Sequence, residues 1–75
     1  MKIEKEKLGR FYLYEGEVYR LIIYCNDPTF EMEKVSNKER IGGSVGSAMA
    51  QKFVELVPRD EVDRLVAEAE SDADQ

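Results

Sequence analysis

Residues 10–25 read RFYLYEGEVYRLIIYC, and this stretch decides the fold that the sequence predicts. Aromatic and β-branched side chains dominate it, as is typical of β-strands. Glu15 and Gly16 interrupt the run, and a glycine there supplies the positive φ that a tight hairpin turn requires. We therefore predict an antiparallel hairpin with strands over 10–14 and 17–25.

Both faces of this hairpin are largely apolar. The two faces of the second strand are Tyr19, Leu21, Ile23, Cys25 and Val18, Arg20, Ile22, Tyr24, and those of the first are Phe11, Leu13 and Tyr12, Tyr14. An antiparallel strand normally leaves one face to water, so something must cover the second face. The cover is either an apolar stripe from a helix of the same chain or a second subunit. Because Cys25 ends an apolar face, we expect its side chain to be buried.

Turn signals divide the next part of the chain into further short elements. The predicted elements are strands over 30–33, 40–45 and 53–57 and a helical turn over 47–52. Residues 30–33 alternate apolar with acidic side chains, which directs Phe30 and Met32 into a core. Five short strands at this spacing predict a mainly β fold, a small five-stranded barrel.

The C-terminal segment predicts an acidic amphipathic helix over 60–71. Asp60 is a favourable N-cap, and Val62, Leu65, Val66 and Ala69 recur at the spacing of one helical face. Residues 1–57 hold nine basic and nine acidic side chains, so the whole net charge of -5 lies in residues 58–75. We expect a single domain over residues 1–75, with a β-barrel at 9–57 followed by this helix.

The composition excludes several classes of function. The chain has no histidine and one cysteine, so Ser-His and Cys-His nucleophiles and the usual zinc sites cannot be built. The acidic balance argues against a nucleic-acid partner. No signal sequence or membrane-spanning run is evident, and the lone cysteine fits a reducing compartment. We expect a cytoplasmic protein that is not an enzyme, uses no cofactor or metal and binds no membrane.

Several turn and core positions carry a family resemblance. Residues 9–19, GRFYLYEGEVY, are followed by Asp27-Pro28-Thr29, Glu39-Arg40-Ile41 and a closing Phe53-Val54-Glu55-Leu56. Together they resemble small SH3-like barrel proteins of uncharacterised prokaryotic and phage families, over residues 9–57. The resemblance implies an SH3-like barrel and a phage or mobile-element origin, where inhibitors and ligand-sequestering proteins such as anti-defence proteins are common. It implies no functional residues.

A glycine-rich stretch, GGSVGS at residues 42–47, is the candidate ligand site. Backbone N–H groups of such a loop, with nearby hydroxyls and cations, can hold a phosphate. The candidate ligand-binding residues are Lys38, Arg40, Gly42, Gly43, Ser44 and Ser47. The alternative is that the glycines serve only a turn or a bulge, because the stretch lacks the ending of a P-loop.

The tyrosines and the acidic helix each allow two interpretations. Tyr12, Tyr14, Tyr19 and Tyr24 form either an aromatic ligand platform or a barrel core. The helix is either a docking surface that mimics a nucleic acid or a solvated face. For a homo-oligomer, the candidate interface residues are Tyr12, Tyr14, Ile22, Tyr24, Val62, Leu65 and Val66.

The function that the sequence favours is binding. We expect capture of a small, phosphate-bearing, nucleotide-like anion at a homo-oligomer interface near residues 40–47. The alternatives are an inhibitor or adaptor that docks on a host protein through the acidic helix, and a plain structural oligomer.

Overall fold

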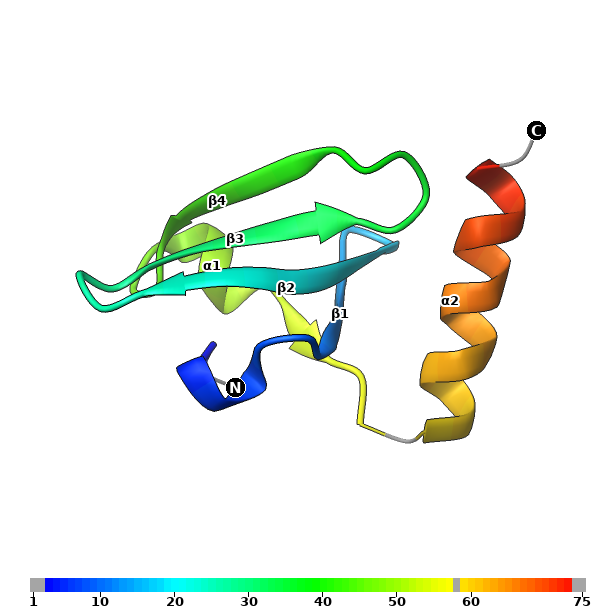
Figure 1. The fold of residues 1–75 in the computed structure, drawn as a ribbon, viewed down its shortest axis with the longest axis horizontal. Coiled ribbons are helices and arrows are strands. Elements are labelled where there is room, and N and C mark those ends of the chain that lie inside the picture. Colours follow the sequence, from blue (N-terminus) through cyan, green and yellow to red (C-terminus); the bar gives the residue numbers. More distant parts are fainter. Residues whose placement is uncertain (1–2, 58, 74–75) are drawn as a thin grey trace.

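The structure is a computed structural model that describes residues 3–57 and 59–73 (Figure 1). Its elements are a 3-10 turn η1 (Lys5–Lys7), strands β1 (Phe11–Tyr14), β2 (Glu17–Cys25), β3 (Thr29–Lys34) and β4 (Arg40–Ser44), a short helix α1 (Ala48–Gln51), strand β5 (Val54–Glu55) and helix α2 (Arg59–Ala73). Within these residues no helix is both long enough and apolar enough to cross a membrane.

The five strands form one antiparallel sheet in the order β4-β3-β2-β1-β5. The predicted hairpin is confirmed, with Tyr14 opposite Glu17 across the turn. Glu15 and Gly16 have φ values of 50° and 79°, the left-handed pair that a two-residue hairpin turn requires. The edge strands β4 and β5 do not pair with each other, so the sheet is not closed. The prediction of a mainly β fold with five strands and a C-terminal helix is confirmed.

One face of the sheet carries an aromatic core around Phe53. The rings of Tyr12, Tyr14, Tyr19 and Phe30 lie 4.3–6.3 Å from the Phe53 ring, centroid to centroid. Phe30 and Met32 are both buried in this core, as their alternation with acidic residues predicts. Ala50 of α1 and Ile3, just before η1, complete it.

The opposite face of the hairpin is covered by α2. Val18, Val35 and Leu56 form a second buried cluster, against which Phe11, Leu13, Val62, Leu65, Val66 and Ala69 pack. Figure 1 shows α2 lying beside the end of the sheet where β1 meets β2. The two-sided apolar pattern of the first strand is thus satisfied within one chain, by the helix stripe that the sequence predicts.

A β-bulge in β2 overturns part of the predicted face assignment. The register shifts between Leu21 and Ile23, so Tyr24 pairs with Phe30 and packs against the aromatic core. An extra residue in one strand moves every following side chain to the other face. The expectation that Cys25 is buried is wrong for this reason, because its side chain is exposed.

The predicted start of the helix also changes by one residue. α2 begins at Arg59, so Asp60 lies in the first turn and is not the N-cap. The position before Arg59 lies outside the described residues.

Candidate functional site

The glycine-rich stretch is used by the sheet and its turns. Gly42 and Gly43 belong to β4, opposite Glu31 and Phe30 of β3. A Cβ atom on Gly42 would lie 2.3 Å from the carbonyl oxygen of Phe30, so the close approach of two backbones requires glycine there. The structural alternative therefore explains Gly42 without a ligand.

The two serines of the stretch cap local structure. The Ser44 hydroxyl accepts a hydrogen bond from the Gly46 N–H at 3.3 Å. The Ser47 hydroxyl accepts one from the Ala50 N–H at 3.2 Å and so N-caps α1. α1 has only four residues. Both hydroxyls already have backbone partners here.

The predicted cations lie away from these hydroxyls. Arg40 and Ser44 stand at opposite ends of β4, about 13 Å apart at the usual rise of a strand. The Arg40 Nε atom lies 3.8 Å from a carboxylate oxygen of Glu33. Lys38 lines a separate hollow with Val66 of α2. The six candidate ligand residues are not brought together in one pocket.

The candidate interface residues divide into three environments. Tyr12 is only 1% exposed, and Tyr14 stacks on Phe53, so both pack inside their own chain. The helix residues Val62, Leu65 and Val66 pack on the chain's own sheet. Ile22 is partly exposed beside Leu8. Tyr24 packs against the aromatic core. Tyr12 and Tyr19 are therefore buried core residues, and Tyr14 and Tyr24 are partly buried against that core.

A buried carboxylate joins the N-terminal turn to the last strand. The Glu55 side chain is 3% exposed and accepts hydrogen bonds from Lys7 Nζ and from Arg10 Nη1, the latter at 3.3 Å. The Lys7 and Arg10 side chains are 25% and 60% exposed. One buried negative charge is therefore shared by two cations, and Arg10 is tethered on one side of its guanidinium group.

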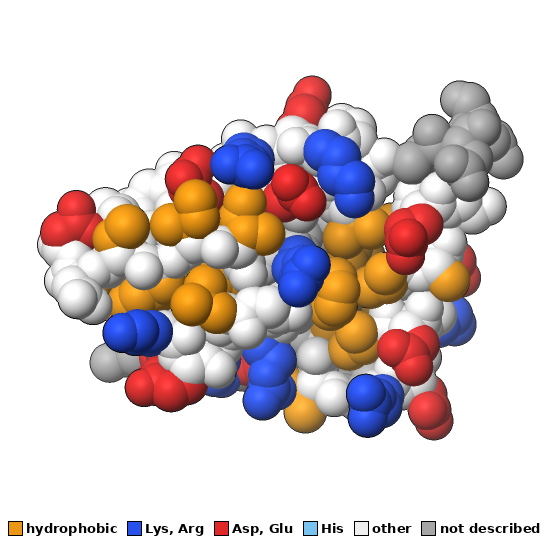
Figure 2. All heavy atoms as spheres, in the orientation of Figure 1, with side chains coloured by type: hydrophobic (Ala, Val, Ile, Leu, Met, Phe, Trp, Pro, Cys, Tyr) orange, Lys and Arg blue, Asp and Glu red, His pale blue; other side chains and the backbone are white. Residues whose placement is uncertain are grey.

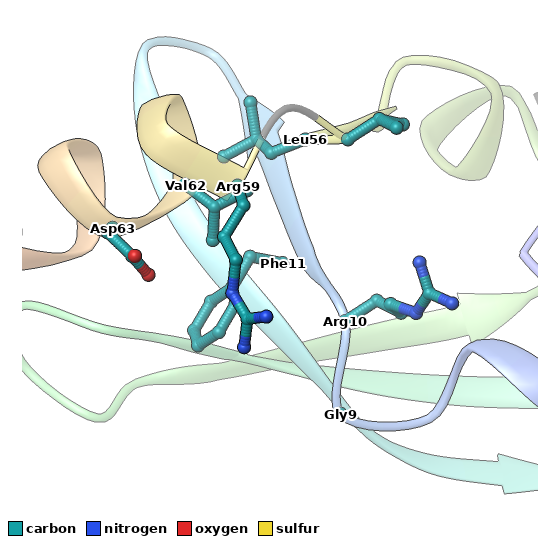
Figure 3. A pocket seen from close by; sticks show the side chains of 8 residues that line it. Gly9, Arg10, Phe11, Leu56, Arg59, Val62 and Asp63 are labelled. Atoms are coloured by element: carbon teal, nitrogen blue, oxygen red, sulfur yellow. The ribbon is translucent and has the colours of Figure 1, made fainter.

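A groove lies between the N-terminal half of α2 and the strands β1 and β5. It encloses about 470 Å³ and is lined by Gly9, Arg10, Phe11, Leu56, Val57, Arg59, Val62 and Asp63. Figure 3 shows the Arg59 side chain reaching from α2 toward Phe11, while the Arg10 side chain extends in the other direction, away from Arg59 and Phe11. Figure 2 shows the hydrophobic side chains between the sheet and α2, bordered by charged ones.

The charges at the groove are unequal. Arg10 and Arg59 contribute two positive charges, and Asp63 is the one carboxylate of the lining. Among the residues that the structure describes, Arg59 makes no ion pair. A cationic site in a protein of net charge -5 is a local exception to its overall charge. The Arg10 guanidinium group is bound to Glu55 and extends away from Arg59 (Figure 3), so the two positive charges lie apart in the groove.

Burial also perturbs Tyr12, which lies opposite Glu55 in the sheet. Its hydroxyl is buried and has no hydrogen-bond partner among the residues that the structure describes. Desolvation, and secondarily the negative charge of Glu55, raise the pKa of Tyr12 to about 12. The hydroxyl therefore stays protonated at neutral pH and offers no base for catalysis.

Sequence reasoning missed the groove and its arginines. The groove exists because the packing of α2 places Arg59, at the start of the helix, on the same groove as Arg10, which lies ahead of β1. One pattern in the sequence pointed to the arginine ahead of β1. Glu55 lies two positions after the core residue Phe53, which places its carboxylate on the buried face of a strand, and a buried carboxylate requires a cation beside it.

Comparison with known proteins gives no assignment. No protein family, curated protein or solved structure matches the chain. Across residues 3–57 and 59–73, no group of three or more acidic, cysteine or histidine side chains is arranged to hold a metal ion. The function is therefore argued from the geometry of the chain itself.

Proposed function

We propose that this protein is a non-catalytic binding protein that captures a small organic anion in the groove between α2 and the sheet. The supporting observation is that Arg10 and Arg59 line one groove whose other walls are mainly apolar. Concave sites with apolar walls and a few charged groups are the usual form of small-molecule sites. This proposal keeps the small anion that the sequence favours as a ligand, without the nucleotide, and moves its site away from residues 40–47.

The two arginines suit an anion for different reasons. Arg10 is held by Glu55, which reduces the side-chain entropy lost when a ligand binds. Arg59 makes no ion pair among the described residues, so binding there costs no existing contact. Both guanidinium groups are planar donors that can grip a carboxylate or phosphate with two hydrogen bonds.

The finer fold class, the oligomeric state, the location and the origin of the protein are also proposals. We propose an SH3-like barrel that is open between β4 and β5, supported by the position of β5 beside β1 and by the short helix before it. A homo-oligomer, a cytoplasmic location and a phage or mobile-element origin remain proposals from the sequence.

A thermal-shift experiment tests the binding function. A panel of small organic anions at millimolar concentration should contain members that raise the melting temperature of the wild type, because a ligand that binds only the folded state stabilises it. Arg10→Met with Arg59→Met should remove the shift. Arg64→Met is the matched control, since Arg64 is exposed on the same helix outside the groove. If Arg40→Met, and not the double variant, loses the ligand-induced rise in melting temperature, the ligand binds at β4 and not in the groove.

Docking through α2 is the second candidate, and the packing of the helix favours it. Its apolar stripe is occupied by the sheet, so Asp60, Glu61, Asp63, Glu68 and Glu70 are exposed. Such a face suits a basic protein surface. In a cross-linking experiment in cells, Glu61→Lys with Glu68→Lys should lose a partner that Arg10→Met with Arg59→Met retains. Retention by both variants excludes this candidate.

A further inference from the structure

We infer that the ligand is an organic monoanion with an apolar body, such as a medium-chain or aryl carboxylate, and not a nucleotide. This inference rests on the proposed function and narrows it to one chemical class. It departs from the nucleotide-like ligand that the sequence favours, because the groove lacks the groups that a nucleotide needs.

The apolar walls determine the body of the ligand. Phe11, Leu56, Val57 and Val62 form most of the side-chain lining. Val57 is 61% exposed, so part of this apolar surface faces water in the free protein. An alkyl or aryl group that covers it gains the free energy of removing apolar area from water.

The polar groups of the lining exclude base and sugar recognition. Apart from the backbone, the polar side chains are Arg10, Arg59 and Asp63, with no serine, threonine, asparagine, glutamine or tyrosine among the lining residues. Sites that bind nucleotides read hydroxyls and base edges with such neutral groups. This groove has charged donors for a head group and apolar surface for the remainder.

The charge balance sets the number of negative charges. The lining holds Arg10, Arg59 and Asp63, and because the Glu55 carboxylate already binds Arg10, Arg59 is the cation of this lining that makes no ion pair among the described residues. Asp60 and Glu61 stand in the first turn of α2. A polyphosphate would bring several negative charges beside these carboxylates, and like charges at short range repel. A single negative charge matches the one guanidinium group of Arg59.

A homologous series tests the inference on the full chain. Linear carboxylates from butanoate to octanoate are titrated into the wild type by calorimetry, with the alcohols of equal length, inorganic phosphate, AMP and ATP as comparisons. Each methylene that becomes buried should tighten binding about fourfold, until the chain outgrows the groove. Octanoate should bind at least about tenfold more tightly than octanol, ATP or phosphate, which corresponds to one charge-assisted contact.

Arg59→Met separates the head group from the body. The substitution removes the charge of Arg59 and keeps an apolar stem, so octanoate affinity should fall toward that of octanol while octanol affinity is unchanged. Arg64→Met should leave both affinities unchanged.

Three outcomes overturn the inference, and they can be told apart. If no anion binds, the proposed function fails as well. If AMP, ATP or phosphate binds more tightly than octanoate and Arg59→Met removes that binding, the groove is an anion site of another class. If octanoate binds equally to wild type and Arg59→Met, Arg59 does not hold the carboxylate and the inference fails.

Discussion

Replacement of Leu65 by aspartate tests whether α2 is an integral part of the fold. Leu65 packs against the buried cluster of Val18, Val35 and Leu56. Full burial of a leucine contributes about 1.5–3 kcal/mol, and Leu65 is partly buried, so the lost hydrophobic term is about 1–2 kcal/mol. A carboxylate facing this cluster adds about 1 kcal/mol. We expect Leu65→Asp to lower the free energy of unfolding by about 2–3 kcal/mol.

Thermal unfolding followed by circular dichroism measures this loss. In a domain of this size 1 kcal/mol corresponds to about 4–8 °C, so the melting temperature should fall by about 10–20 °C. Ala67→Asp adds the same charge to the same helix at an exposed position and serves as the matched control. If the two variants melt at the same temperature, α2 is not packed on the sheet and the groove beside it does not exist in solution.

Three further substitutions test separate contacts. Gly42→Ala should lower the free energy of unfolding in urea by about 1–3 kcal/mol, because its Cβ would lie 2.3 Å from a backbone oxygen. Gly46→Ala is the control and should leave it unchanged, because its Cβ meets nothing closer than 4.0 Å. Equal stability of the two variants would contradict the packing of β4 on β3. Glu55→Gln should lower the free energy of unfolding by about 1–2 kcal/mol, a modest loss because its two cationic partners are partly exposed to water. Unchanged stability would mean that the contacts of Glu55 with Lys7 and Arg10 do not stabilise the fold. Tyr12→Phe removes an unpaired buried hydroxyl and should stabilise the fold at neutral pH. The Tyr12 hydroxyl has a pKa near 10.0 in the unfolded chain and about 12 in the folded protein. As the pH rises from 10 to about 12, the wild type should therefore lose stability that the Tyr12→Phe variant does not lose. Parallel pH profiles of the two proteins would refute the burial of Tyr12.

Local patterns in the sequence were sufficient for the elements and their order. The turn at Glu15 and Gly16 predicted the register of β1 and β2, and the stripe through Leu65 predicted a helix as one of two possible covers for the second face of the hairpin, the one that the structure shows. Both depend on side chains close together in the chain, where alternation and helical spacing apply directly. The glycines of β4 allowed a structural or a functional interpretation, and only the distance from Gly42 to the Phe30 carbonyl favours the former.

The features that sequence reasoning missed depend on long-range geometry. Nothing in the run from Leu21 to Ile23 indicates a bulge, yet the bulge decides that Tyr24 packs inward and Cys25 is exposed. The groove depends on the packing of α2, which places Arg10 and Arg59, 49 positions apart in the sequence, along one hollow. Contacts of this kind are set by tertiary structure and leave no periodic signal.

Amide chemical shifts during a titration with octanoate test the central claim most directly, because they report where a ligand binds as well as whether it binds. We expect concentration-dependent shifts at Gly9, Phe11, Val57 and Val62, the residues around the two arginines of the groove. The N–H groups of residues 42–47 should stay unchanged. Shifts confined to residues 42–47, or no shifts at millimolar octanoate, would contradict the assignment of the groove as the ligand site.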